Sequence, residues 1–402
     1  MKKILILFFS LCFFAALLII SGAVERDSSL LGKKPEVNNT IYIGVYEPFT
    51  GDDAKGAMRE ILGFRYANSV CPTIQINGVT YDIVLVEADN MSNKEGAELS
   101  AESLVKANVT AVLGSYDSEN AAVGAPIFAK TNIPVIGVSC PSSLLPKNNG
   151  FFRMCYTDSF QSGVLANCAY NMEYRKAAVL TQTADIYSKE AGKLFSEEFT
   201  RLGGEVVNFS FQSGQENFKS LSEELKTSDI DVVIMLSGPS EAKYFISQSR
   251  KNGITCPIIG PESWDSGILL SEATAASRDV YISSEFNGGS TGDPISVEFA
   301  ERYSTWVSKD SDLIKDNGGC DYTSSATALA YDAYMLAIDA IKSTNSADPQ
   351  IVMEAIRTTT YEGVTGKISF IEGDSSKKTA FIKTIDVRNK QFEVLQTISV
   401  GK

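Results

Sequence analysis

Short apolar segments alternate with amphipathic segments along most of this 402-residue chain. Several of the apolar segments are apolar on both faces, and the segments between them carry their apolar residues on one side, as helices do. Strands of that kind are typical of a parallel sheet covered by helices. We therefore predict an α/β chain with doubly wound parallel sheets. The predicted strands that follow residue 80 are 81–89, 110–114, 133–138, 176–181, 205–211, 231–236, 256–260 and 279–284, and helices are expected at 94–107, 119–131, 188–202, 217–227 and 240–252.

The stretch from residue 41 to residue 68 predicts the first strand–helix unit. Ile41, Ile43 and Val45 alternate in a β-branched run, Pro48 and Gly51 mark a turn, and a helical apolar pattern follows directly. The turn would lie at the carboxyl end of the first strand. Open α/β sheets hold their ligands at that end, so the turn is a candidate part of a binding site.

The chain is long enough for two lobes, since about 375 residues exceed one ordinary core. The composition shifts at 151–158 and at 287–294, where the strand–helix rhythm pauses. We predict an N-terminal lobe of 41–158 plus 287–362 and a C-terminal lobe of 159–286 plus 363–402, with a multi-strand hinge and a ligand cleft between the lobes. The tail from Gly366 alternates like an antiparallel meander, with turns near Gly373 and Asn389. We expect it to extend the sheet of the second lobe.

The first 23 residues predict export from the cytoplasm. Lys2 and Lys3 precede an apolar run from Ile4 to Ile20, and small residues follow it. The run approaches the length of a membrane span, so an uncleaved N-terminal anchor is the alternative. Residues 24–39 are predicted to be a linker. We expect the protein in the periplasm or on the outer face of the cell membrane, touching the membrane only through this segment if it is retained.

Charge and composition exclude several classes of function. The chain has 36 Lys and Arg against 49 Asp and Glu, a formal net charge of −13, which argues against binding to nucleic acid or anionic lipid. It has no histidine, which excludes Ser-His-Asp and Cys-His catalysis and the usual zinc centres. No nucleophile elbow or diagnostic pair of carboxylates is present. We expect no cofactor, no metal and no enzymatic activity, and keep an exported enzyme as a third possibility.

Six cysteines follow the predicted signal, and their pairing is open. An even number in an exported protein permits disulfides, whereas the wide spacings and the apolar neighbours equally suit buried free thiols. They are Cys71, Cys140, Cys155, Cys168, Cys256 and Cys320.

Two serines mark a candidate anion site on the first lobe. Tyr116 and Ser118 come after the strand 110–114 at the start of a helix, and Ser139 follows the strand 133–138. A serine at a helix start can simply cap backbone amides. The same amides, the helix dipole and a hydroxyl can also hold a carboxylate. If the two strands are neighbours, Ser118 and Ser139 lie side by side.

The second lobe offers a candidate cation site. Glu262 follows the apolar strand 256–260 and Tyr187 follows the strand 176–181. Glu262 can be a helix-start acid and Tyr187 a packing residue, but a carboxylate in a water-poor cleft needs a partner such as an ammonium group. A carboxylate site opposite an ammonium site describes an amino acid held between two lobes. Trp264, Tyr322 and Phe286 are either lining residues for its side chain or core residues.

The order of several motifs resembles a known family, the type I extracytoplasmic solute-binding proteins of ABC transporters, especially the leucine/isoleucine/valine-binding branch. The resemblance covers nearly the whole chain after the signal, and implies the periplasmic binding protein type I fold. It further implies that Tyr116, Ser118 and Ser139 face the carboxylate of a bound amino acid, with Tyr187 as aromatic wall and Glu262 as ammonium partner. The motifs are PFTG, VEADN, VLGSYDSENAAVGAPIFAKTNIPVIGVS, YTDSFQSG, GPESWDSG and ALAYDAYMLAIDAI.

The chain departs from the family pattern in three places. Ser188 stands where a glycine usually follows the tyrosine. Pro141 stands where a threonine often contacts the carboxylate, so we expect neighbouring Ser142 to take that contact. The loop at Ala54 and Lys55 lacks an aromatic that lines some members' pockets. Side-chain selectivity therefore does not carry over from the family.

The resemblance implies a monomeric binding protein that closes on an amino acid, with branched-chain types favoured, and delivers it to a membrane ABC permease. The alternative is a sensor or accessory ectodomain that reports closure to a membrane partner. Both rest on a ligand that touches both lobes.

Overall fold

The computed structural model describes residues 39–142, 145, 150–376 and 379–399, and Thr40–Lys402 form one compact unit. The predicted export segment at 1–23 and nearly all of the predicted linker lie outside the described residues. Among the helices that are described, none combines the length and the apolar character needed to cross a bilayer.

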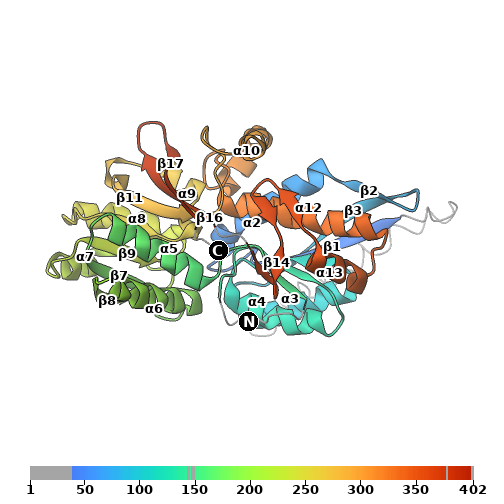
Figure 1. Cartoon of the computed structure of the whole chain (residues 1–402), viewed down its shortest axis with the longest axis horizontal. Helices are drawn as coiled ribbons and strands as arrows, with labels where there is room; N and C mark the ends of the chain where they lie inside the picture. Colours follow the sequence, from blue (N-terminus) through green and yellow to red (C-terminus); the bar gives the residue numbers. More distant parts are fainter. Residues whose placement is uncertain (1–38, 143–144, 146–149, 377–378, 400–402) are drawn as a thin grey trace, which may run out of the picture. The chain divides into compact units, whose positions relative to one another are not determined.

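In the described part of the chain, the first sheet has eight strands and is parallel at its centre (Figure 1). β1 lies between β3 and β4 and runs parallel to both. β2 and β3 form an antiparallel hairpin at one edge, and β15 joins the opposite edge through β6. In sheet order the strands are β14 (Phe370–Ile371), β15 (Asp374–Ser375), β6 (Phe151–Arg153), β5 (Val135–Gly137), β4 (Ala111–Leu113), β1 (Thr40–Glu47), β3 (Val79–Asp89) and β2 (Thr73–Ile76).

Helices cover both faces of this sheet because its central strand is apolar on both sides. Ile41, Ile43 and Val45 of β1 pack in one core, and Tyr46 packs in another core on the opposite face. The first core includes side chains of α2 (Ala54–Val70), α12 (Ser325–Thr344) and α13 (Pro349–Thr358). The second includes α3 (Lys94–Lys106) and α4 (Ser118–Ala129). Aromatic residues of α10 (Pro294–Val307) pack against α2 from outside, and α11 (Ser311–Asp316) follows α10.

The second sheet has seven strands in the described residues, drawn in Figure 1 in green and yellow, with β16 and β17 in red. Five are parallel, β16 pairs antiparallel with β11, and β17 pairs antiparallel with β16. The strand order is β17 (Gln391–Ser399), β16 (Thr379–Asp386), β11 (Val280–Ser284), β10 (Ile258–Gly260), β9 (Val232–Leu236), β7 (Lys176–Gln182) and β8 (Glu205–Phe211).

Helices also cover both faces of the second sheet, with a separate core under each layer. One layer is α5 (Asp158–Asn171) and α6 (Ile186–Arg201). The other contains α7 (Lys219–Lys226), α8 (Pro239–Lys251), α9 (Gly267–Ser271) and the short 3₁₀ turns η2 (Glu262–Trp264) and η3 (Ala275–Ser277). A small separate hairpin joins β12 (Tyr361–Gly363) and β13 (Gly366–Ile368).

The chain passes between the sheets three times, after β6, after β11 and after β15. The Tyr156 hydroxyl donates to the carbonyl oxygens of Ser284, at 2.8 Å, and Thr379, at 2.9 Å, so one side chain joins all three crossings. The predicted fold class is confirmed: two doubly wound lobes with parallel cores are joined by a multi-strand hinge.

The predicted boundary at residue 363 is wrong for part of the tail. The backbone amide of Arg153 donates to the Gly373 carbonyl at 2.7 Å, and the Arg153 guanidinium pairs with the Asp374 carboxylate at 3.2 Å. These contacts hold β14 and β15 on the first sheet. Asp332 of α12 likewise accepts the backbone amides of Val364 and Thr365, both at 2.8 Å. Only the tail from β16 onward joins the second sheet.

Candidate ligand-binding site

A cavity of about 450 Å³ lies where the carboxyl ends of strands from both sheets meet. We call it the interlobe cleft. Its size suits a small metabolite. Residues that follow β4 and β5 line one wall, and residues that follow β7 and β10 line the other. Of the residues predicted for the site, those that line the cleft are Tyr116, Ser118, Ser139, Ser142, Tyr187 and Glu262. The structure brings these six together, and their contact with a ligand stays a prediction.

Trp264 does not line the cleft, which corrects the prediction made for it. The side chain is fully buried in the core of the second lobe. Its indole Nε1 donates to the Ser237 carbonyl at 3.0 Å. The ring lies against Gly260, where an added Cβ would come within 2.1 Å of it. The missing side chain at Gly260 thus makes room for the indole inside the lobe. Tyr322 and Phe286 are also absent from the described lining and pack elsewhere.

The helix start at α4 is capped by Asp117 and not by Ser118. The Asp117 carboxylate accepts the Asn120 amide at 2.7 Å and the Ser115 hydroxyl at 3.2 Å. Burial raises the pKa of Asp117, while these donors lower it. The Ser118 hydroxyl oxygen accepts the Ser142 amide at 3.3 Å. Because the Asn120 amide is already taken, an anion at this helix start depends on the hydroxyl groups more than on that amide.

On the opposite wall, Tyr187 and Ser188 begin α6. The Tyr187 hydroxyl donates to the Gln161 side-chain oxygen at 2.6 Å, which fixes the ring at the cleft. Ser188 is buried, and its hydroxyl donates to the Leu236 carbonyl at 2.6 Å while accepting the Gln182 amide at 2.8 Å. Ser188 therefore holds α6 to the ends of β7 and β9. A glycine at this position would lack those bonds.

The two walls touch at the rim of the cleft. The Ser142 hydroxyl of the first lobe donates to the Glu190 carboxylate of α6 at 2.9 Å. The Ile186 amide of the second lobe donates to the Glu119 carboxylate of α4 at 3.3 Å. Each contact joins a side chain or amide of one lobe to a carboxylate of the other.

Glu262 is the most unusual polar group of the cleft. Its side chain is only 5% exposed, and its Oε1 has no hydrogen-bond partner among the described residues. Burial raises the pKa of this carboxyl, and the nearby Arg59 guanidinium lowers it. A buried carboxylate oxygen without a donor is unstable on its own and favours the binding of a cationic donor.

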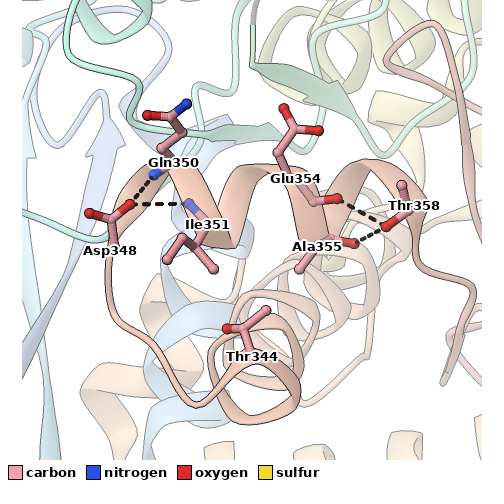
Figure 2. A pocket seen from close by; sticks show the side chains of 7 residues that line it. All are labelled: Thr344, Asp348, Gln350, Ile351, Glu354, Ala355 and Thr358. Atoms are coloured by element: carbon pink, nitrogen blue, oxygen red, sulfur yellow. Dashed lines mark hydrogen bonds between the residues drawn. The ribbon is translucent and has the colours of Figure 1, made fainter.

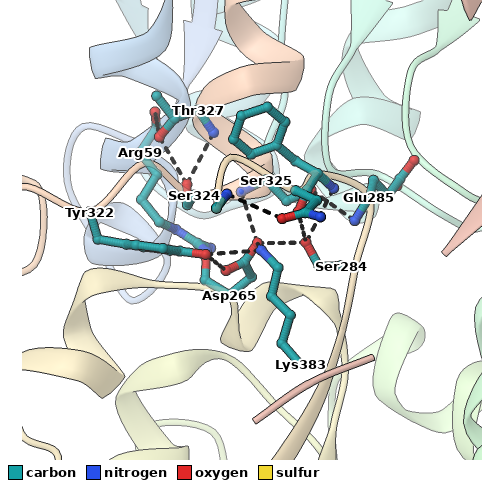
Figure 3. Close-up of polar contacts among 12 residues, drawn as sticks. Arg59, Asp265, Ser284, Glu285, Tyr322, Ser324, Ser325, Thr327 and Lys383 are labelled. Atoms are coloured by element: carbon teal, nitrogen blue, oxygen red, sulfur yellow. Dashed lines mark hydrogen bonds and ion pairs between the residues drawn. The ribbon is translucent and has the colours of Figure 1, made fainter. Parts of the chain in front are cut away.

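A buried network holds the loop that carries Glu262 (Figure 3). Arg59 of α2 donates through Nη1 to the carbonyl oxygens of Ser263, at 2.9 Å, and Asp265, at 3.0 Å. The Asp265 carboxylate in turn accepts Lys383 Nζ at 3.0 Å, and Ser284 Oγ at 2.7 Å. These bonds fix the backbone that directly follows Glu262, so its carboxylate is held in place before a ligand arrives.

Sequence reasoning missed Arg59, Asp265 and Lys383. A signal was present for two of them, because Arg59 lies on the buried side of α2 and Lys383 interrupts an apolar strand. Charged residues at such positions are rarely fully buried unless they are paired. The pattern could have marked them as members of a buried ionic network, but not as partners of one another.

A second hollow lies along α13 and is unlike the cleft (Figure 2). Its lining comes from α13 and the end of α12 alone. Asp348 uses its carboxylate to cap α13, accepting the amides of Gln350 and Ile351 at 3.0 and 3.1 Å. We do not assign a ligand to this hollow. The described residues also contain no cluster of His, Cys, Asp and Glu suited to a metal ion. The six cysteines are free thiols.

Comparison with known proteins identifies the family. A family model described as "Periplasmic binding protein" matches residues 40–382. The leucine-, isoleucine-, valine-, threonine-, and alanine-binding protein of Pseudomonas aeruginosa is 24% identical over 85% of this chain and 89% of the relative. The branched-chain amino acid substrate-binding protein LivJ of Streptococcus pneumoniae, solved with isoleucine, is 26% identical, with a TM-score of 0.77 over 90% of this chain and 99% of that one.

A further structure shows how varied the ligands of this fold are. A solute-binding protein from Rhodopseudomonas palustris, solved with 3,4-dihydroxybenzoic acid, has a TM-score of 0.78 at 19% identity over 90% of this chain and 98% of that one. This similarity concerns the fold alone.

The chain belongs to the periplasmic binding protein family, the type I substrate-binding proteins of ABC transporters. The predicted resemblance is confirmed. Proteins of this family are exported to the periplasm, bind small molecules and catalyse no reaction, so the prediction that the chain is not an enzyme is confirmed as well.

Proposed function

We propose that this protein captures an amino acid between its lobes and delivers it to an ABC permease. The observation that carries the proposal is the pairing of the Glu262 carboxylate, buried and with one oxygen lacking a partner, with a wall of hydroxyl groups across the cleft. An α-amino acid has the matching pair of groups, an ammonium for Glu262 and a carboxylate for the hydroxyls.

The carboxylate end would be held by the first lobe. Ser118, Ser139 and Ser142 lie after β4 and β5, which are adjacent and parallel. A carboxylate accepts several hydrogen bonds, and hydroxyl groups can turn to donate them. The positive end of the α4 dipole adds to the attraction, although Asp117 already offsets part of it.

Branched-chain aliphatic amino acids are the first class to test, because leucine and isoleucine are named for the relatives above. Ala122, Val123 and Ile186 also line the cleft and offer apolar contact. Resemblance alone supports this choice of side chain.

Closure of the lobes would report binding. A ligand that touches both walls favours the state in which the walls meet, and a permease can recognise that state. We propose a monomer that works in this way, with membrane contact limited to residues 1–23 if they are retained. A sensor or accessory ectodomain that reports closure to a membrane partner uses the same physics, and association with a permease distinguishes the two.

The test is to identify the solute that the protein carries. Native mass spectrometry of the gently purified protein should show a bound small molecule, and calorimetric titration of the stripped protein should give a dissociation constant for it. An amino acid bound one to one supports the proposal. A carried solute without an amino group, or tight binding only of aromatic acids, would contradict it.

A further inference from the structure

Carboxyl groups greatly outnumber basic groups in the lining of the cleft. Among the described residues that line it, the one basic side chain is Lys94, which is largely exposed and lies 3.9 Å from Glu98. Carboxylates are supplied by both lobes. Beside Glu262, they include Asp53 and Asp117 from the first lobe and Asp185 and Glu241 from the second.

Most of these carboxylates already have donors. Asp117 and Asp185 cap the starts of α4 and α6, and Glu241 accepts the Gly214 amide at 3.0 Å. Asp53 differs from them. It precedes α2, makes no side-chain capping bond there, and its carboxylate has no hydrogen bond or ion pair with any residue in the described part of the chain. Of the carboxylates named here, Asp53 and Glu262 thus lack a full set of partners; the neighbouring Asp52, which also lines the cleft, is exposed to solvent.

Asp53 and Glu262 have different surroundings: the Asp53 amide donates to Ser92 Oγ at 3.1 Å at the start of α2, whereas Glu262 lies on the loop bound by Arg59. Burial, followed by the charges of Asp117, Asp185 and Glu241, raises the pKa of Asp53 to about 8. Glu262 is influenced instead by Arg59 and Asp265, after burial. We therefore treat the two acids as separate positions for a cation.

Tyr116 is influenced by the charges of both acids, Asp53 and Glu262. Its ring packs against Gly56, where an added Cβ would come within 2.6 Å of the phenol. Gly56 is three residues after Asp53, so the two share one side of the first turn of α2. The Tyr116 hydroxyl feels the charges of Asp53 and Glu262, and its pKa is raised first by burial and then by these acids, against the effect of Arg59. A ligand that lies along Tyr116 from Glu262 would extend towards Asp53.

We propose that the bound amino acid has a second cationic group, an ammonium or guanidinium at the end of its side chain, and that Asp53 is the partner of this group. The inference rests on the proposed function, because it takes Glu262 as the partner of the α-ammonium. It differs from the aliphatic class that resemblance favours. With an aliphatic side chain in the cleft, Asp53 would stay largely protonated at pH 7 among the neighbouring acids, whereas a cation would stabilise its charged form.

The test uses ligands and variants that differ by one group. Lysine and norleucine have the same carbon chain, and only lysine has the terminal ammonium. Asp53→Asn removes the proposed partner, and Asp82→Asn removes the same charge from the exposed side of β3, away from the cleft. Titration calorimetry on ligand-stripped protein at pH 7, with arginine, ornithine, leucine and isoleucine added to the panel, measures each affinity. Circular dichroism melts confirm that each variant is folded.

We expect at least one of lysine, ornithine and arginine to bind about 10- to 100-fold more tightly than norleucine and leucine, as for a charge-assisted hydrogen bond. Asp53→Asn should remove this preference and Asp82→Asn should leave it within about threefold. Binding of the cation should also release protons, seen as a heat that depends on the buffer. Leucine or norleucine binding as tightly as every cationic amino acid would overturn the inference and leave the proposed function standing, as would equal effects of the two variants. Absence of binding by any amino acid would instead refute the proposed function.

Discussion

Replacing Glu262 by glutamine removes the negative charge of its side chain with little change of shape, and so tests its role as the partner of the ligand ammonium. The side chain is 5% exposed, and one of its oxygens has no partner among the described residues. If that oxygen accepts the ligand ammonium, the change removes a charge-assisted hydrogen bond worth about 1.5–3 kcal/mol. We expect the binding free energy of the amino acid to weaken by about 2 kcal/mol, which raises its dissociation constant roughly 30-fold.

The stability of the free protein should respond differently. Glutamine removes the cost of burying a charge, but it also removes the attraction between Glu262 and Arg59, which lowers the pKa of the carboxyl. These effects oppose each other, so the free energy of unfolding without ligand should change by less than about 1 kcal/mol. A residue that only supports the fold would show the reverse, with lower stability and little effect on the affinity of the folded protein.

The assay is calorimetric titration of wild type and Glu262→Gln, paired with urea unfolding of both without ligand. Glu205→Gln on the exposed side of β8 is the control for a change of charge alone. An affinity within twofold of wild type would refute the role of Glu262 as ammonium partner. A loss of stability above about 2 kcal/mol would show that the carboxylate serves the fold instead.

Three other predictions concern the fold and its pH dependence. Lys383→Met leaves Asp265 buried without its cation, and urea unfolding should show a loss of about 3–5 kcal/mol; a loss under 1 kcal/mol would contradict the buried ion pair. Gly260→Ala should lower stability by about 1–3 kcal/mol because its Cβ would meet Trp264, whereas Gly163→Ala in α5, with open space around it, should be neutral or stabilising; equal effects in thermal melts would be inconsistent with this packing. The pKa values of Asp53, about 8, and Asp185, about 6, are raised above those of the unfolded chain. The native state therefore holds more protons between about pH 4 and 8, and its stability should fall as the pH rises through that range. Asp53→Asn should lessen the fall, and a stability profile against pH identical to that of wild type would exclude the shift.

The strands and helices could be predicted because their signals are local. The run 205–211 alternates in sequence and is β8 with the same limits, and 176–181 is one residue shorter than β7. The hairpin of β2 and β3 was missed although Asn77 and Gly78 form the turn, both with positive φ. Asn-Gly between alternating segments is the signal that would have found it.

The parts that failed depend on contacts between distant residues. The tail at β14 and β15 joins the first sheet because of Arg153, more than two hundred positions earlier. Trp264 is an aromatic residue of the kind that lines pockets, but it lies in the core, where its ring packs on Gly260 and its Nε1 donates to the Ser237 carbonyl. The network of Arg59, Asp265 and Lys383 joins three separate parts of the chain. Local patterns specify elements, and they do not specify which buried charge meets which.

The most direct test of the account is a thermal-melt panel on ligand-stripped protein with each of the twenty amino acids. Ligand at about a hundred times its dissociation constant should add roughly 2.7 kcal/mol, which corresponds to a shift of about 3–4 °C for a compact unit of this size. We predict such a shift for one or a few amino acids and none for the rest. A cooperative melt that no amino acid shifts, from protein shown to carry no solute, would contradict the account.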